Sequence, residues 1–177
     1  MIYTGQSLVD CLNDRMINAI QILCFASPYV GSLKEVQQIL GGKWMRSSIE
    51  FKLLTDVDAG FVRKDTFDAL TTSPNTEIRT LLSLHAKIYI IDDWCLITSA
   101  NLTGTAFCRR YEVGNVLNDV SEAVQLFDEW WQMGTPVTAV LSRTPKSILD
   151  YQDGKQFNKK CKLPRYKTIS SDKFLQK

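Results

Sequence analysis

Two periodicities of apolar positions alternate along the chain, one typical of helices and the other of strands. Apolar residues recur every four positions from Leu8 to Ile20, which predicts an amphipathic helix capped at its start by Ser7. The uninterrupted apolar run Ile22–Ala26 then predicts a buried strand. A second helix is expected from residue 32 to residue 41, because Ser-x-x-Glu opens this segment and a pair of glycines closes it.

Helical and extended patterns continue to alternate as far as residue 133. Further strands are predicted at residues 49–54, 84–91, 94–98 and 111–117, and further helices at residues 61–70 and 121–133. Asp92 and Asp93 separate two of these strands, which is typical of a hairpin turn. Strands interleaved with helices predict an α/β fold, in which a mixed β-sheet is flanked by helices on both faces.

The composition fits one soluble domain. At 177 residues, with 45% hydrophobic and 23% charged residues, the chain is long enough for a single well-packed core. Its apolar runs are far shorter than the roughly 20 residues that cross a bilayer, and Met1–Gln6 does not resemble a signal peptide. We therefore expect a cytoplasmic protein without membrane contact. Five cysteines without a C-x-x-C pair, and a single histidine, predict reduced thiols, no metal site and no cofactor.

Charge is divided unevenly between two parts of the chain. Residues 137–177 contain ten Lys and Arg against three Asp and Glu, whereas residues 1–136 contain eleven against sixteen. Periodicity is also lost beyond residue 136, which predicts a folded domain at residues 1–135 and a basic C-terminal arm at residues 136–177.

The arm is a candidate nucleic-acid contact, because its cations can neutralise phosphates and its aromatic rings can stack on bases. The candidate phosphate-binding residues are Lys159, Lys160, Lys162, Arg165 and Lys167. The alternative is a solvated or dimer-contacting segment, which is the ordinary role of a charged run.

His85, the single histidine, opens a run that reads H-x-K-x-x-x-x-D and that also contains Lys87 and Asp92. Side chains alternate between the two faces of a strand, so His85 and Lys87 are expected on the same face. An imidazole with an unperturbed pKa of about 6.5 is a competent nucleophile near neutral pH, and a protonated lysine beside it can bind a phosphate oxygen. Asp92 falls at the predicted turn, where we expect a structural role in the hairpin.

A second polar cluster follows at Ser99, Asn101 and Glu112. Ser99 and Asn101 can donate hydrogen bonds to the same phosphate oxygens, and Glu112 is the candidate to fix the tautomer of His85. The alternatives are structural roles. In these, Ser99 caps the following turn, Asn101 adopts a left-handed backbone there, and Glu112 is a surface strand residue. The chain has no G-x-S-x-G motif, which argues against a serine hydrolase.

These clusters resemble the catalytic half-site of the phospholipase D superfamily. The resemblance is carried by Leu84–Asp92, Thr98–Thr103 and Ala26–Tyr29, and it extends more loosely over residues 5–120. It implies that residues 1–135 are a phospholipase D-like catalytic domain, with a covalent phosphohistidine intermediate, a second histidine as general acid and no metal requirement. Thr98 departs from the pattern, which usually has glycine there; it can crowd the turn but removes no functional group.

One active site of this superfamily takes two H-K-D motifs, and this chain has one. The resemblance therefore implies a symmetric homodimer in which His85 and Lys87 of both subunits meet across a twofold axis. Small single-motif members, including the catalytic domains of metal-independent restriction endonucleases, are typically nucleases.

The leading hypothesis is thus a metal-independent endonuclease, a phosphodiesterase that cleaves DNA or RNA, with DNA favoured. One alternative is a phospholipase or phosphatidyl transferase acting on lipid phosphodiesters. Another is a non-catalytic nucleic-acid-binding subunit of a larger complex.

Overall fold

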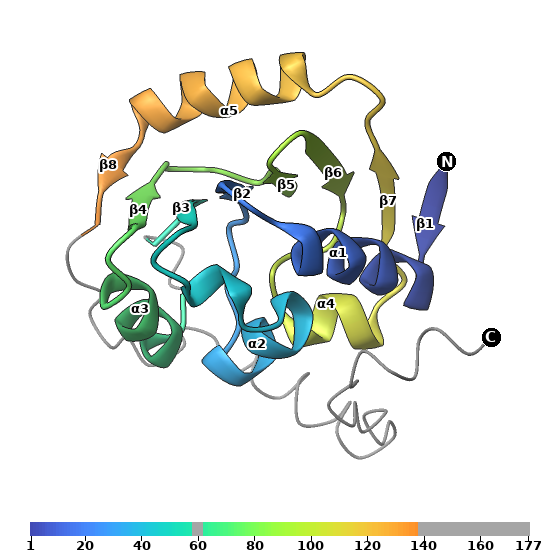
Figure 1. Ribbon diagram of the computed structural model, residues 1–177, viewed down its shortest axis with the longest axis horizontal. Helices are drawn as coiled ribbons and strands as arrows, with labels where there is room; N and C mark the ends of the chain where they lie inside the picture. The colour runs from blue at the N-terminus through green and yellow to red at the C-terminus, as the bar shows by residue number, and fades with distance from the viewer. Residues whose placement is uncertain (58–61, 138–177) are drawn as a thin grey trace.

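The computed structural model describes residues 1–57 and 62–137, which form one mixed β-sheet with helices on both faces (Figure 1). The eight strands of these residues lie in the order β1-β7-β6-β5-β2-β3-β4-β8. Strands β2, β3 and β4 run parallel to one another, and all other neighbouring pairs are antiparallel. The strands are β1 (Ile2–Thr4), β2 (Ile22–Ala26), β3 (Glu50–Thr55), β4 (Thr76–Thr80), β5 (Ile88–Ile91), β6 (Trp94–Thr98), β7 (Val113–Val116) and β8 (Thr135–Pro136).

The helices divide unequally between the two faces of the sheet (Figure 1). One face is covered by α1 (Gln6–Asn18), α2 (Leu33–Leu40), α3 (Lys64–Thr71) and α4 (Gly104–Arg109), with a short 3-10 turn at Lys43–Met45. Only α5 (Ser121–Met133) crosses the other face of the described sheet. No helix in residues 1–57 or 62–137 combines the length and the apolar character needed to span a membrane.

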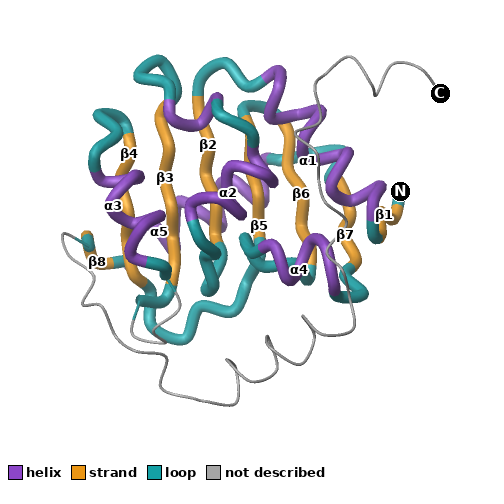
Figure 2. Tube along the Cα trace, turned by 90° about the horizontal axis from the view of Figure 1, so that it is seen from below, coloured by secondary structure: helices purple, strands orange, loops and turns teal. Residues whose placement is uncertain are grey.

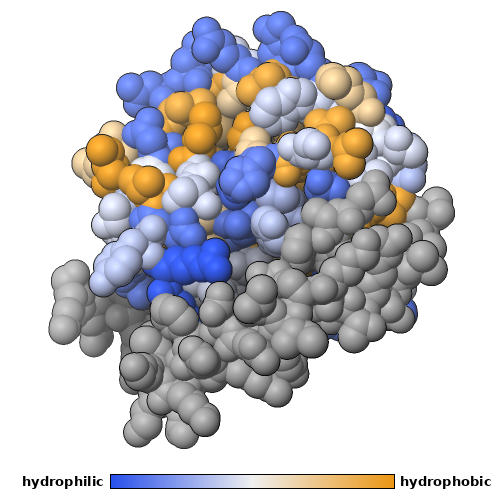
Figure 3. Space-filling model, turned by 180° about the vertical axis from the view of Figure 1, so that it is seen from behind, coloured by the Kyte–Doolittle hydropathy of each residue, from blue (hydrophilic) through white to orange (hydrophobic). Residues whose placement is uncertain are grey.

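Two hydrophobic clusters, one on each face, hold the layers together. All four residues of β5 are buried, with Tyr89 and Ile91 in the larger cluster under α1 to α4 and with Ile88 and Ile90 in the smaller one under α5. A strand that is buried on both faces needs apolar side chains at every position, which explains the uninterrupted apolar run. On the side seen in Figure 3, the described apolar residues form separate groups divided by hydrophilic residues.

The structure confirms the predicted fold and several of its elements. Strands β2 and β6 and helix α5 have the predicted bounds. Helix α2 begins with a capping box, because the Ser32 hydroxyl accepts from the Glu35 N–H while the Glu35 carboxylate accepts from the Ser32 N–H. A two-residue turn joins β5 to β6, and Asp92 in this turn has a φ of 51°.

The predicted start of α1 was wrong. Gly5, with a φ of 52°, occupies the N-cap position, and the helix begins one residue before Ser7. The Ser7 hydroxyl instead donates to the carbonyl of Thr4 and accepts from its N–H. The physical reason is β1, which ends at Thr4 and forces a tight turn into the helix.

Other predicted segments also have different bounds, and the strand predicted at residues 49–54 is β3 at residues 50–55. The strand predicted at residues 84–91 begins only at Ile88, because Leu84 closes a turn by donating to the carbonyl of Leu81. The predicted strand 111–117 is limited to β7, and the predicted helix 61–70 is α3 at residues 64–71. Strands β1, β4 and β8 and helix α4 were not predicted; they have two to six residues each, too few to show a periodicity.

Candidate active site

The expected catalytic residues gather at one edge of the sheet, although three separate segments carry them. Strand β5 begins opposite the end of β2, and β6 ends beside the start of both β5 and β7. Figure 2 shows these strands side by side. The segments before β5, after β6 and before β7 therefore lie at the same edge. The segment before β5 carries His85, the one after β6 carries Ser99 and Asn101, and the one before β7 carries Glu112.

His85 and Lys87 form the centre of this edge. The Lys87 ammonium lies 3.3 Å from Nδ1 and 3.3 Å from Nε2 of the His85 ring, and it donates to the His85 carbonyl at 2.6 Å. His85 is exposed, whereas Lys87 is buried at 7% exposure. Both precede β5, but the backbone remains tied to the sheet because the Lys87 carbonyl accepts from the N–H of Thr98 at 3.1 Å.

The charge on Lys87 depends on two opposing effects. Burial lowers the pKa of its ammonium group, and the negative charge of Glu112 acts in the opposite direction. The net pKa is below the ordinary lysine value. An ammonium group that is partly stripped of water, next to an exposed imidazole, is suited to attract an anion such as a phosphodiester.

Ser99 joins Glu112 to this group. The Ser99 hydroxyl donates to the Glu112 carboxylate and accepts from the Val113 N–H at 3.0 Å. The Ser99 N–H donates to the Val113 carbonyl at 2.9 Å. Among the described residues, the Glu112 carboxylate has a hydrogen bond to Ser99 and none to the His85 ring. The carboxylate is therefore placed to orient the serine hydroxyl and to act on Lys87 through its charge.

Asn101 lies in the turn after β6. Its amide oxygen is buried and finds no hydrogen-bond partner among the described residues. The Asn101 carbonyl accepts from the Thr103 N–H at 2.7 Å, and the Thr103 hydroxyl caps α4. A buried acceptor without a partner costs free energy, and such groups are concentrated at functional sites.

Asp56 is a site residue that the sequence reasoning missed. It follows β3, is buried at 6% exposure, and accepts from the Ser83 N–H at 3.0 Å. Ser83 has a φ of 64°, so this hydrogen bond fixes a left-handed turn in the segment that leads to His85. The signal in the sequence was a carboxylate placed directly after a buried parallel strand, since the ends of such strands meet at one edge.

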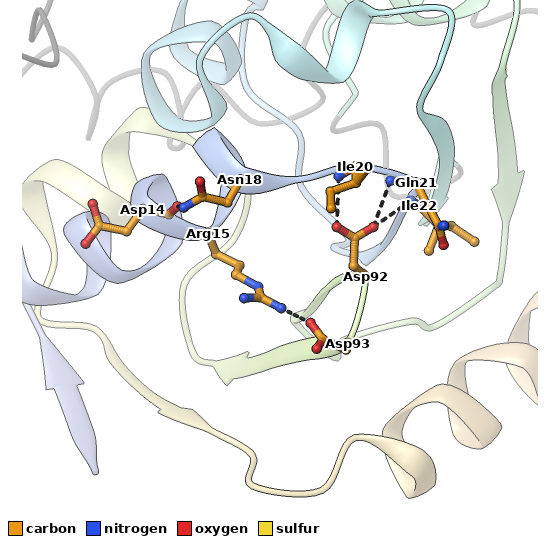
Figure 4. Close-up of polar contacts among 8 residues, drawn as sticks. All are labelled: Asp14, Arg15, Asn18, Ile20, Gln21, Ile22, Asp92 and Asp93. Atoms are coloured by element: carbon orange, nitrogen blue, oxygen red, sulfur yellow. Dashed lines mark hydrogen bonds and ion pairs between the residues drawn. The ribbon is translucent and has the colours of Figure 1, made fainter.

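Asp92 belongs to the opposite edge of the sheet (Figure 4). Its carboxylate accepts hydrogen bonds at 2.8–2.9 Å from three consecutive backbone N–H groups at the junction of α1 and β2. These belong to Ile20, Gln21 and Ile22. Burial alone would raise the pKa of Asp92, but the three N–H groups and the charge of Arg15 hold it below the ordinary value. The contacts of Asp92 are thus with the α1–β2 connection rather than with the catalytic edge.

The predicted nucleic-acid contacts lie outside the described residues. They are Lys159, Lys160, Lys162, Arg165 and Lys167. Within residues 1–57 and 62–137, no three His, Cys, Asp or Glu side chains are grouped so that they could hold a metal ion.

The fold and the site together define a phospholipase D-like protein. The family model described as cardiolipin synthase, PLD-like domain, matches residues 12–133, well over half of the chain. The chain therefore belongs to the phospholipase D-like family. No curated protein matches it in sequence.

Several solved structures share the fold. NucT from Helicobacter pylori has a TM-score of 0.63 at 18% identity, over 77% of this chain and 98% of NucT. Nuc, a phospholipase D family member from Salmonella typhimurium, has a TM-score of 0.63 at 16% identity, over 78% of this chain and 99% of Nuc. The phosphatidylserine synthase of Haemophilus influenzae Rd KW20 has a TM-score of 0.61 at 13% identity, over 89% of this chain and 46% of the synthase.

Proposed function

We propose that this protein is a metal-independent phosphodiesterase that cleaves nucleic acid, DNA in preference to RNA, through a covalent intermediate on His85. The observation that carries the proposal is the Lys87 ammonium at 3.3 Å from both nitrogens of the chain's single histidine. This pair combines a nucleophile with a cation that binds phosphate, in a chain of the phospholipase D-like family.

In the first step, a ring nitrogen of His85 attacks phosphorus, and the bond from phosphorus to the leaving oxygen breaks. A second, protonated imidazole gives its proton to that oxygen. In the second step, water attacks phosphorus, the nitrogen–phosphorus bond breaks, and the second imidazole takes the proton of the water. Lys87 and Asn101 hold the non-bridging oxygens while charge accumulates on them, and the Ser99 hydroxyl joins them by turning its proton from Glu112 to the phosphate.

The second imidazole comes from another copy of the chain. Each chain has one histidine, so the two steps require a homodimer in which the two His85 side chains face one substrate. The exposed position of His85 at the edge of the sheet supports this arrangement, because a partner subunit can reach it there. In the same proposal, the cations of the C-terminal arm contact phosphates away from the cleaved bond, which makes binding strongly dependent on salt.

The deciding experiment measures cleavage of labelled single- and double-stranded DNA and RNA in excess EDTA. Wild type is compared with His85→Ala and Lys87→Met, and Lys52→Met is the matched control, a half-buried lysine whose ion pair is with Glu50 on β3. We expect wild type and Lys52→Met to cleave, Lys87→Met to lose at least about 100-fold in rate, and His85→Ala to be inactive.

An alkaline quench would preserve the phosphoramidate, so radioactive substrate is expected to label wild type and not His85→Ala. Salt-dependent binding without cleavage would refute the enzyme and favour a non-catalytic binding subunit. Turnover of phosphatidyl lipids, with no cleavage of nucleic acid, would refute nucleic acid as the substrate and favour a phosphodiesterase that acts on lipids.

A further inference from the structure

The backbone of the turn that carries Ser99 and Asn101 is hydrogen-bonded to the hydroxyl groups of two buried side chains. The Thr98 hydroxyl accepts from the Ala100 N–H at 3.1 Å. The Tyr89 hydroxyl donates to the Ala100 carbonyl at 2.8 Å. Both backbone polar groups of the residue between Ser99 and Asn101 are thus bound by side chains.

Further hydrogen bonds of side-chain hydroxyl groups hold the turn on both sides of Ala100. The Thr98 hydroxyl also donates to the Val113 carbonyl at 2.6 Å, which joins the turn to β7. The Ser27 hydroxyl accepts from the Leu102 N–H at 3.0 Å, which joins the turn to the end of β2. The backbone is therefore held at the residues immediately before and after Asn101.

Packing leaves the Tyr89 hydroxyl little freedom. Tyr89 and Ala100 are each 0% exposed, so bulk water has no access to this hydrogen bond. The Tyr89 ring lies edge-on to Phe25 at a centroid distance of 5.1 Å and is tilted against Phe107 at 6.1 Å. Burial raises the pKa of Tyr89, so the hydroxyl keeps its proton and remains a donor.

Thr98 occupies the position where the family resemblance leads one to expect glycine, and the structure shows why the larger residue fits. Its side chain faces Gly114 on the neighbouring β7, where an added Cβ would lie 3.2 Å from the Cβ of Thr98. Gly114 thus leaves the space that Thr98 fills. The threonine does not crowd the turn, and its hydroxyl makes two hydrogen bonds there.

We propose that Tyr89 and Thr98 are positioning residues, which fix the peptide groups around Ala100 so that Ser99 and Asn101 reach the phosphate at the same time. This inference rests on the proposed phosphodiesterase function. Ser99 and Asn101 are separated by one residue, so rotation of the backbone at Ala100 moves both donors. Loss of alignment on the order of 1 Å is enough to reduce a rate up to about 100-fold.

The test compares variants that remove one hydroxyl each. Tyr89→Phe and Thr98→Val keep the shape of the side chain, and Thr98→Ser restores the hydroxyl. Phe25→Leu is the matched control, because it disturbs the same aromatic cluster and removes no hydroxyl group that could hold the backbone of Ala100. For each folded variant, kcat and KM are measured with a labelled oligonucleotide in EDTA, together with the inhibition constant of inorganic phosphate.

We expect Tyr89→Phe and Thr98→Val to lower kcat on the order of tenfold and to weaken inhibition by phosphate, while Thr98→Ser recovers both. Phe25→Leu is expected to lower thermal stability and to leave the phosphate inhibition constant unchanged. Wild-type values of kcat and phosphate inhibition in both hydroxyl-free variants would overturn the inference and leave the phosphodiesterase intact. A wild-type protein that neither cleaves nor binds phosphate would overturn both.

Discussion

Replacing Asp92 with alanine is expected to lower the free energy of unfolding by about 2–4 kcal/mol. The carboxylate accepts three hydrogen bonds at 2.8–2.9 Å from the backbone of residues 20–22. A hydrogen bond to a charged group contributes about 1.5–3 kcal/mol. The full sum does not apply, because Ile20 and Gln21 are exposed and water reaches their N–H groups in the variant.

The same carboxylate predicts a dependence on pH with a definite sign. The pKa of Asp92 is lower in the folded protein than its unfolded value of about 3.9, so its contribution is complete above that value. The contribution is lost as pH falls through the lower pKa of the folded state. The stability difference between wild type and Asp92→Ala should therefore be greatest at neutral pH and decrease toward about pH 3.

Urea unfolding, followed by circular dichroism at pH 7 and at about pH 3, measures both effects. Asp93→Ala is the matched control, because the neighbouring Asp93 side chain is 85% exposed and, within the part of the chain that the structure describes, forms its one ion pair with Arg15. Such a pair contributes less than about 1 kcal/mol. A loss below about 0.5 kcal/mol at pH 7, or equal losses in the two aspartate variants, would refute the reasoning from these hydrogen bonds.

Two further predictions concern the catalytic edge and its support. Glu112→Gln removes the charge that raises the pKa of Lys87, so the pKa of the Lys87 ammonium, measured from its NMR chemical shift as a function of pH, should fall; an unchanged pKa would contradict this coupling. Gly114→Ala places a Cβ 2.6 Å from Leu8, 2.9 Å from Leu96 and 3.2 Å from Thr98, and urea unfolding should show a loss of about 1–3 kcal/mol. A wild-type urea midpoint would show that these side chains can move aside.

The sequence was sufficient for elements whose signal is local. Residues 22–26 were predicted as a strand because a continuous apolar run is needed where both faces of a sheet are covered, and residues 94–98 because a hairpin turn at Asp92 and Asp93 precedes them. The capping box of α2 lies within four consecutive residues. The short strands β1 and β8 were missed because each depends on its partner strand, β7 or β4, and not on a pattern of its own.

For the candidate site, the sequence by itself was enough to nominate the groups, since His85 is the only histidine and Lys87 follows it at strand spacing. The tertiary structure decided how those groups are held. Asp56 meets Ser83 across 27 positions, and the Tyr89 hydroxyl meets Ala100 only because β5 and β6 pair in one register. Residue types and short spacings are properties of the chain, whereas the order and register of the strands bring distant polar groups into contact. The candidate groups were therefore readable from the sequence, and their arrangement was readable only from the fold.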